Sequence, residues 1–280
     1  MGPLVSTDRL AAESGAPDLR VLDASFFLPG SGRDARAEYE AAHIPGAMFF
    51  DIDAIADPDS PLPHMLPPAH LFASRARALG LGDGDRIVVY DNSPLHSAAR
   101  AWWMLRAFGA RHVAVLDGGF QKWTAEGRPV EAGVTEARRG HFTPVLDAAL
   151  VKDKADVLGL VGVESHVIVD ARSAARFAGE GIEPRPGVTP GHIPGSRSLP
   201  QGSLFNADNS MKRGAELRAA FDAAGVDLTK PMVTTCGSGV TAAVLLLGAQ
   251  LLGKSDVALY DGSWSEWGAD RDTPKAKGAA

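Results

Sequence analysis

The sequence predicts an α/β protein of two similar domains in tandem, each with a mostly parallel sheet flanked by helices on both faces. The chain has 280 residues, enough for two domains of ordinary size. Short runs of Val, Ile and Leu alternate with helical patterns, and these runs are continuously apolar, which is typical of parallel strands buried on both faces. Several segments of the first half recur in the same order in the second half, which indicates a duplicated domain.

The internal repeat consists of matched pairs of segments. In the first half they are Val21-Leu-Asp-Ala-Ser, His43-Ile-Pro-Gly-Ala, Arg86-Ile-Val-Val-Tyr-Asp and Val113-Ala-Val-Leu-Asp-Gly-Gly-Phe. In the second half they are Val167-Ile-Val-Asp-Ala-Arg-Ser, His192-Ile-Pro-Gly-Ser, Met232-Val-Thr-Thr-Cys and Val257-Ala-Leu-Tyr-Asp-Gly-Ser-Trp. Repeats of this length are duplicated domains rather than solenoid units. We therefore place an N-terminal domain at residues 1–135, a linker at 136–155 and a C-terminal domain at 156–280.

The individual elements follow from these patterns in chain order. In the first half we expect a strand at 21–23, an amphipathic helix at 69–79, a strand at 86–90, an apolar helix at 98–108 and a strand at 113–116. The second half has the matching series at 167–170, 215–224, 232–235, 241–252 and 257–260. The apolar helices should lie against their sheets, and chemically active side chains should gather where strands end and helices begin. The polar tail from Ala269 is expected to be mobile.

Composition and charge exclude several classes of protein. Hydrophobic residues make up 45% of the chain and charged residues 22%, which is ordinary for a soluble protein with a buried core. The net charge of −6 gives no indication of a basic surface for nucleic acid. The N-terminal residues lack the pattern of a secretory signal, and the longest apolar run, 242–247, is too short to span a membrane. We therefore expect a cytoplasmic protein that binds neither nucleic acid nor membrane.

Cys236 is the single cysteine of the chain, and it lies at the junction of a predicted strand and a predicted helix. With no second cysteine, the chain has no internal disulfide and no cysteine-cluster metal site. Backbone N–H groups and the helix dipole at such a junction favour the thiolate. Gly237 and Gly239 let backbone amides approach a bound anion, and Ser238 adds a hydroxyl. These flanks favour a reactive thiol over a small buried side chain, which is a common role of free cysteine.

The repeated segments and the run Cys236-Gly-Ser-Gly-Val-Thr together resemble the two-domain rhodanese-like sulfurtransferases, and among them the 3-mercaptopyruvate sulfurtransferases. The resemblance extends from about Val21 to Trp267. It implies that the Cys236 thiolate takes sulfur from 3-mercaptopyruvate, forms a persulfide and releases pyruvate. The sulfur would then pass to an outside acceptor, such as thioredoxin, a small thiol or cyanide. The resemblance implies no cofactor and no metal ion.

The resemblance also implies a proton relay for the pyruvate enolate. A serine–histidine–aspartate relay of the family maps onto Ser238, His64 and Asp53. His64 and Asp53 lie in the first half of the chain, whereas Ser238 lies in the second. The relay would therefore require the two domains to close on each other.

A substrate-binding segment of the family matches this chain at two arginines, Arg176 and Arg185. The carboxylate and carbonyl of the donor need cationic partners, and arginine offers bidentate geometry. The neighbouring Arg172 is expected to form a structural ion pair. The loop amides after the cysteine would stabilise the thiolate and the persulfide. The residues expected to contact substrate are Arg176, Arg185, Gly237, Gly239, Val240 and Thr241.

Other residues of the repeat are interpreted as structural or silent. The His-Ile-Pro-Gly segments are turns, because proline fixes φ and glycine permits the bend, so His43 and His192 are expected to be structural. The position that matches Cys236 in the first half falls near Asp91. A carboxylate cannot take up a sulfur atom, so the N-terminal domain is expected to be catalytically silent.

Three alternatives stay open at this point. Thiosulfate-specific rhodaneses carry cationic residues just after the cysteine, whereas Gly237 and Ser238 are neutral, which favours mercaptopyruvate over thiosulfate as the donor. A cysteine phosphatase needs an arginine in its loop to bind the phosphoryl oxygens. This chain has Ala242 at that position, which counts against a phosphatase. A non-enzymatic carrier that holds persulfide for a partner would use the same loop as the enzyme.

Overall fold

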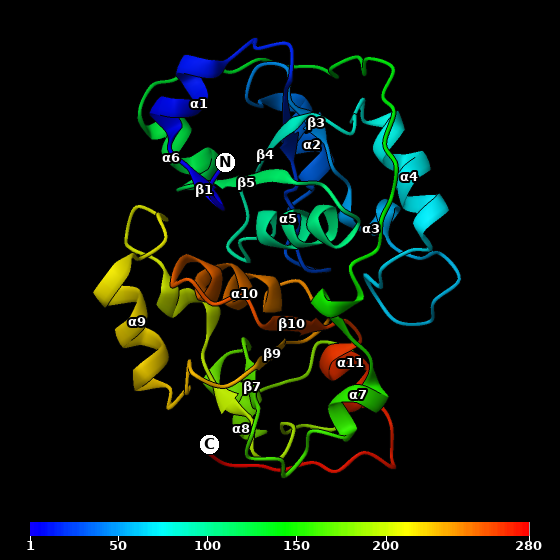
Figure 1. Cartoon of the computed structure of the whole chain (residues 1–280), viewed down its shortest axis with the longest axis vertical. Helices are drawn as coiled ribbons and strands as arrows, with labels where there is room; N and C mark the ends of the chain where they lie inside the picture. Colours follow the sequence, from blue (N-terminus) through cyan, green and yellow to red (C-terminus); the bar gives the residue numbers. More distant parts are fainter. Residues whose placement is uncertain (280) are drawn as a thin grey trace. The chain divides into compact units, whose positions relative to one another are not determined.

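Each half of the chain folds into a five-stranded sheet of parallel strands with helices around it (Figure 1). The structure is a computed structural model, and it describes residues 1–279. Packing divides these residues into two compact units. The first unit contains Met1–Pro58, Leu66–Asp147 and Asn206–Ser210, and the second contains Asp59–Met65, Ala148–Phe205 and the chain from Met211 onward.

The first unit has the strand order β1-β5-β4-β2-β3. Its strands are β1 (Leu4–Val5), β2 (Leu19–Asp23), β3 (Met48–Phe49), β4 (Arg86–Tyr90) and β5 (His112–Leu116). Its helices are α1 (Thr7–Glu13), α2 (Ala35–Ala41), α3 (Ile52–Ile55), α4 (Ala69–Ala78), α5 (Ala98–Ala107) and α6 (Gly119–Ala125). The central strands β2, β4 and β5 are the ones that their apolar runs predicted.

The second unit has the equivalent strand order, β6-β10-β9-β7-β8. Its strands are β6 (Val151–Lys152), β7 (Val167–Asp170), β8 (Arg197–Ser198), β9 (Met232–Thr235) and β10 (Val257–Tyr260). Its helices are α7 (Lys154–Leu158), α8 (Ala174–Ala178), α9 (Gly214–Ala223), α10 (Ala242–Leu251) and α11 (Ser263–Trp267), with 3-10 turns at Ala148–Leu150 and Gln201–Leu204. The identical topology confirms the predicted pair of parallel α/β domains.

Successive residues of a strand point to opposite faces of the sheet, so each central strand contacts helices on both faces. Val88 and Tyr90 of β4 pack with Leu10 of α1 and Trp123 of α6 in one core cluster. The intervening residues of β4 are also buried, and α5 packs along β4 and β5 (Figure 1). The sheet of the first unit is therefore covered by a different set of helices on each face.

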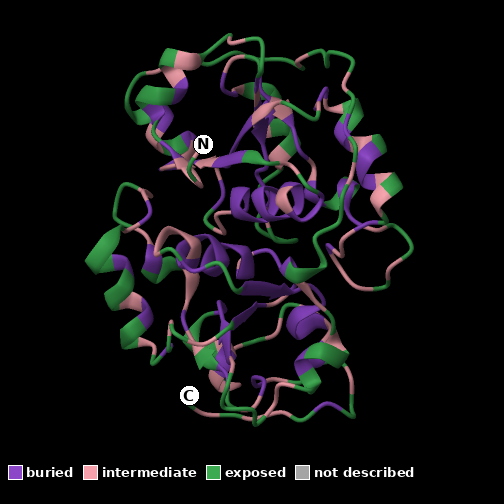
Figure 2. Ribbon diagram, in the orientation of Figure 1, coloured by how far each residue is buried: buried purple, intermediate pink, exposed green. Residues whose placement is uncertain are grey.

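The second unit repeats this packing. Val233 of β9 and Tyr260 of β10 lie in one cluster with Trp264 and Trp267 of α11. Helix α10 packs along β9 and β10, as α5 does along its own strands. Both α5 and α10 are buried over most of their length (Figure 2), which explains their nearly continuous apolar sequences. The four predicted helices match α4, α5, α9 and α10 to within one residue at each end.

Two segments pack in a way that the sequence did not indicate. Residues 59–65 lie in the range that we assigned to the N-terminal domain, but they pack with the second unit. Val151 and Lys152 lie in the range that we assigned to the linker, but they form β6, which pairs with β10. A strand of two residues is too short to show a hydrophobic period, so the sequence pattern does not predict it. The boundaries at 135 and 156 stay a prediction.

The tail from Ala269, which we expected to be mobile, is held by hydrogen bonds of the second unit. Ala276 and His192 exchange backbone hydrogen bonds as an isolated bridge, at 2.9 Å in each direction. The indole Nε1 of Trp267 donates to the carbonyl of Pro274 at 2.7 Å. A polar sequence indicated mobility, but these tertiary contacts order the segment. Among the described residues, no helix has both the length and the apolar character needed to cross a membrane.

Candidate active site

Cys236 is the first residue after β9, at the carboxyl end of a central strand of the second sheet. Its side chain is buried. The loop that follows turns at Gly239, whose φ of +78° lies in the left-handed region that glycine adopts easily. Helix α10 then begins at Ala242, and Thr241 makes no side-chain capping hydrogen bond to its first turn. The predicted strand–loop–helix arrangement around the thiol is therefore present.

The segment after β10 fixes the backbone of this loop. The N–H of Cys236 donates to Ser263 Oγ at 3.2 Å, and its carbonyl accepts from the N–H of Trp264 at 2.9 Å. The carbonyl of Gly237 accepts from both the N–H and the Oγ of Ser265, at 2.8 and 2.6 Å. Ser263 has a φ of +49°, a strained value for a residue with a side chain.

Sequence reasoning did not single out Ser263 and Ser265 as functional. They lie in the repeated Asp-Gly-Ser-Trp segment, and the repeat was the signal that could have pointed to them. Ser263 accepts from the N–H of Cys236, and Ser265 donates to the carbonyl of Gly237, so together they fix the backbone that carries the thiol.

Ser238, two residues after Cys236 in the loop, forms a buried pair with His64. His64 Nδ1 lies 3.0 Å from Ser238 Oγ, and each residue is only 6% exposed. His64 has a φ of +63°, which few residues other than glycine adopt without a compensating contact. Because residues 59–65 pack with the second unit, this pair forms within that unit. The structure thus brings together two of the three predicted relay residues.

Asp53, the third predicted relay residue, belongs to the first unit. It lies in the first turn of α3 and is exposed. Its participation in the relay stays a prediction.

Arg176 lies beside the cysteine loop. It belongs to α8, where Ser173 caps the helix by accepting from the Arg176 N–H. A Cβ placed on Gly237 would lie 3.2 Å from Nη2 of Arg176, so glycine at 237 is what lets the guanidinium approach the loop. Arg185 is partly buried in the segment between α8 and β8. Its role toward substrate stays a prediction.

Arg172 forms the ion pair expected of it. Its Nη2 lies 2.7 Å from Asp170 Oδ2, and both side chains are 1% exposed. A second carboxylate, Glu183, accepts from Arg172 at 2.9 Å and from Arg176 at 2.6 Å. Glu183 was not identified from the sequence, although it lies within the arginine segment that was.

His43 and His192 occupy equivalent structural positions. Each ring is buried, and each Nδ1 bonds a backbone carbonyl, that of Tyr39 at 2.8 Å and that of Phe177 at 2.9 Å. The ring of His43 also stacks on that of Tyr39, and the ring of His192 on that of Phe177, with ring centroids 4.2 and 3.8 Å apart. These contacts agree with the structural role expected of both histidines.

Asp91 follows β4 as Cys236 follows β9, so it occupies the equivalent position of the first unit. Its carboxylate accepts from the N–H groups of Ser93 at 2.9 Å and Ala98 at 2.7 Å. Burial raises the pKa of Asp91 to about 7. The loop of the first unit thus binds a carboxylate of its own chain through amides, and it carries no thiol.

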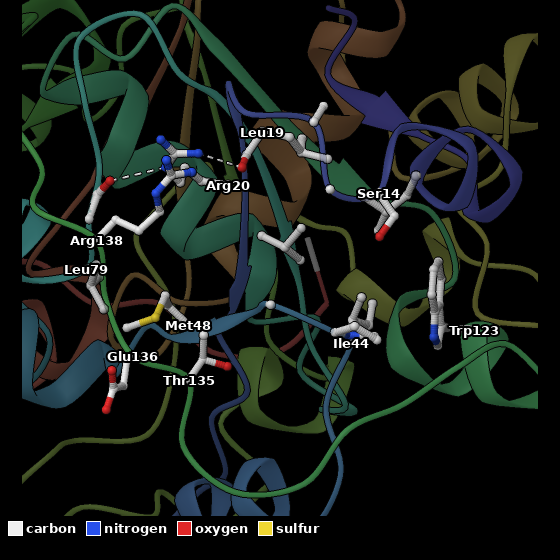
Figure 3. Close-up of a pocket in the computed structure, with 17 residues that line it drawn as sticks. Ser14, Leu19, Arg20, Ile44, Met48, Leu79, Trp123, Thr135, Glu136 and Arg138 are labelled. Carbon is white, nitrogen blue, oxygen red and sulfur yellow. Dashed lines mark hydrogen bonds between the residues drawn. The ribbon is translucent and has the colours of Figure 1, made fainter.

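Each unit also contains a cavity at the opposite end of its strands. The first, about 410 Å³, is lined by Leu19 at the start of β2 and by Ile44 and Met48 (Figure 3). The second, about 570 Å³, is lined by Val167 at the start of β7 and by Pro194. Cavities at equivalent places in both repeats are a product of the shared fold. The thiol-bearing loop, rather than either cavity, is the candidate active site.

The arrangement around Cys236 is suited to nucleophilic transfer of a group to sulfur. It combines a thiol, a serine–histidine pair for proton transfer and an arginine for an anionic substrate. In the described part of the chain, no group of three or more His, Cys, Asp or Glu side chains is placed to bind a metal ion.

Comparison with protein families and known sequences agrees with the duplicated fold. A model of the rhodanese-like domain matches residues 6–126 and again 153–270. A 3-mercaptopyruvate sulfurtransferase of Mus musculus is 47% identical over 93% of this chain and 88% of the mouse protein. One from Escherichia coli K12 is 44% identical over 96% of both chains. A thiosulfate sulfurtransferase of Cricetulus griseus is 45% identical over 94% of this chain and 91% of that protein.

Solved structures show the same architecture. The crystal structure of SseA from Escherichia coli, described as a 3-mercaptopyruvate sulfotransferase, superposes with a TM-score of 0.86 and 42% identity. The superposition covers 94% of this chain and 99% of that one. The crystal structure of Tum1 from Saccharomyces cerevisiae gives a TM-score of 0.88 at 30% identity, over 95% of this chain and 94% of that one.

Proposed function

Since the chain belongs to the rhodanese-like family and carries two copies of its domain, we propose that it transfers the sulfur of 3-mercaptopyruvate through Cys236 to a thiol or cyanide. The chain is an enzyme of the sulfurtransferase class, the class named for its mouse and Escherichia coli relatives. The observation that carries the choice of donor is the 3.0 Å contact between His64 and Ser238 of the cysteine loop. Mercaptopyruvate leaves an enolate that must be protonated, and this pair can supply the proton.

The first half-reaction charges the enzyme with sulfur. The Cys236 thiolate attacks the sulfur of the donor, a new S–S bond forms, and the bond between that sulfur and C3 of the donor breaks. The electron pair of the broken bond stays on the pyruvate fragment as an enolate. One proton delivered to C3 through Ser238 and His64 then gives pyruvate, while Cys236 holds a persulfide.

The second half-reaction discharges the persulfide. An acceptor thiolate attacks the outer sulfur, takes it as its own persulfide and returns Cys236 as a thiolate; cyanide would leave as thiocyanate. Because the chain has one cysteine, no resolving thiol of its own can complete the cycle. We propose that thioredoxin or a small thiol accepts the sulfur, and that the reaction takes place in the cytoplasm.

Substrate binding is assigned to two arginines and to the loop. Arg176 and Arg185 bind the carboxylate and carbonyl of the donor. The amides of Gly237, Gly239, Val240 and Thr241 stabilise the thiolate and the persulfide. The close approach of Arg176 to Gly237 supports the first of these roles, because it puts a cation beside the residue that follows the nucleophile.

Thiosulfate is the second candidate donor. The Cricetulus griseus relative is named a thiosulfate sulfurtransferase, and an Arabidopsis thaliana relative, 41% identical, is named for both donors. Gly237 and Ser238 are neutral, so the loop offers less to a doubly charged donor than to a singly charged one. Thiosulfate should therefore be a weaker substrate.

A side-by-side donor assay tests the proposed function. With a dithiol acceptor, we expect continuous turnover and a kcat/KM at least about tenfold higher for mercaptopyruvate than for thiosulfate. A higher kcat/KM for thiosulfate would reassign the enzyme as a rhodanese. A single stoichiometric burst with either donor would identify a persulfide carrier instead.

Replacing either arginine should weaken donor binding. We expect Arg176→Ala and Arg185→Ala each to raise KM for mercaptopyruvate about tenfold or more, and KM for thiosulfate less. Arg218→Ala is the matched control, because Arg218 is an exposed arginine of α9 in the same unit. Equal losses with both donors would mean that the arginines are structural.

A further inference from the structure

We propose that Glu183 is a positioning residue: it holds Arg176 against the cysteine loop and adapts the site to a singly charged donor. The inference rests on the proposed function, because it concerns the donor of that reaction. It is carried by a series of alternating charges that is buried at Asp170, Arg172 and Glu183 and ends at the partly exposed Arg176 beside the loop.

The chain of charges reaches the loop through Arg176. Nη2 of Arg176 donates to Glu183 Oε2 at 2.6 Å, and the same nitrogen lies 3.2 Å from the point where a Cβ on Gly237 would be. Nε of Arg176 is buried and has no hydrogen-bond partner among the described residues. Glu183 therefore occupies one edge of the guanidinium, and the N–H groups that remain can bind a donor carboxylate.

Glu183 is itself held from the other side. Its side chain is 5% exposed, and its Oε1 accepts from Arg172 Nη1 at 2.9 Å. One carboxylate thus bridges two guanidiniums, one oxygen to each. A side chain held at both oxygens has little freedom, so the position of Arg176 is determined by Glu183 rather than by solvent.

Arg172 ties this bridge to the elements that carry the nucleophile. It donates to Asp170, the last residue of β7, at 2.7 Å and to the carbonyl of Gly191 at 2.7 Å. Its guanidinium lies 4.5 Å from the ring centroid of Trp264. The backbone N–H of Trp264 donates to the carbonyl of Cys236. The network and the thiol therefore share the same rigid support.

The four charged side chains of the network have no net charge, and this determines which donor anions the site attracts. Asp170 and Glu183 carry two negative charges, which balance the two positive charges of Arg172 and Arg176. A neutral network directs a guanidinium at one carboxylate without creating a strongly positive field. Removing the charge of Glu183 would leave one positive charge uncompensated beside the cysteine loop, which favours a dianion such as thiosulfate.

The test is the donor preference of Glu183→Gln. Glutamine has one acceptor oxygen, so it can satisfy only one of the two arginines. We expect KM for mercaptopyruvate to rise about tenfold with kcat nearly unchanged, and KM for thiosulfate to stay level or fall. The ratio of kcat/KM for the two donors should therefore drop at least about tenfold. A merely structural residue would lower both activities together and leave this ratio unchanged.

Two further variants complete the experiment. Glu180→Gln removes the same charge from an exposed residue of the same segment, and it should leave the donor ratio unchanged. Glu183→Asp keeps the charge but is too short to reach both arginines, so it should raise KM for mercaptopyruvate while moving the ratio less than glutamine does. This variant decides the question if Glu183→Gln does not fold. An unaltered KM in Glu183→Asp, or the same donor ratio in Glu183→Gln and Glu180→Gln, would overturn the inference.

The wild-type enzyme in the same assay separates this inference from the function on which it rests. Wild-type turnover of mercaptopyruvate together with unresponsive Glu183 variants removes the positioning role alone. Absence of wild-type turnover with mercaptopyruvate removes the proposed function, and the inference with it.

Discussion

Cys236→Ser should abolish sulfur transfer from every donor, with turnover reduced at least about a thousandfold. Serine has nearly the shape of cysteine, and the backbone bonds to Ser263 and Trp264 do not involve the replaced atom. The hydroxyl oxygen, however, is a far weaker nucleophile at neutral pH and cannot form a persulfide. The measurement is steady-state turnover with mercaptopyruvate and thiosulfate, with a dithiol or cyanide as acceptor.

The control for Cys236→Ser is the stability of the variant. Its thermal midpoint should match that of the wild type, because the replaced side chain is small and the loop keeps its hydrogen bonds. Appreciable residual turnover by a folded variant would contradict the assignment of Cys236 as the nucleophile.

Ser238→Ala should have the second-largest effect, and the effect should depend on the donor. The substitution removes the hydroxyl that contacts His64 at 3.0 Å and so breaks the path that delivers a proton to the enolate. We expect turnover of mercaptopyruvate to fall about a hundredfold, which is a typical contribution of general acid catalysis. Turnover of thiosulfate should fall much less, because the sulfite that leaves needs no proton on carbon.

The donor ratio is the informative quantity for Ser238→Ala. Ser255→Ala is a suitable control, since Ser255 is an exposed serine of the same unit. If Ser238→Ala reduced both activities equally, the hydroxyl would be structural and the relay would be refuted.

Repetition and apolar pattern predicted most of the fold. The central strands β2, β4, β7 and β9 each contain a short apolar run, α4 and α9 are amphipathic, and α5 and α10 are mostly apolar. The strands at the edges of the two sheets are two residues long and carry no such pattern; they are β1, β3, β6 and β8. Their formation depends on pairing with a longer neighbour, which is tertiary information.

The candidate site was predictable only in part, because some of its contacts join residues that are far apart in the sequence. Cys236 and its glycines are local in sequence, so the strand–loop–helix motif indicated them directly. The contact of His64 with Ser238 joins positions 174 residues apart, and only the family resemblance suggested it. The packing of residues 59–65 with the second unit could not be read from the sequence, because it has no local signature.

Supporting residues were the hardest to predict. Glu183 looks like any acidic side chain of a polar segment, and only the structure shows it bridging Arg172 and Arg176. Ser263 likewise has the sequence context of an ordinary turn residue, and only the structure shows its bond to the Cys236 N–H. Such roles depend on which side chains meet in three dimensions.

In the proposed reaction, sulfur from 3-mercaptopyruvate passes through a persulfide on Cys236. The most direct measurement is the intact mass of the wild-type protein after reaction with one equivalent of 3-mercaptopyruvate and no acceptor, with the released pyruvate quantified alongside. We expect one added sulfur atom on Cys236 for each pyruvate released, and its complete removal by a dithiol. Release of pyruvate with Cys236 unmodified, or the same mass gain in Cys236→Ser, would contradict the proposed reaction.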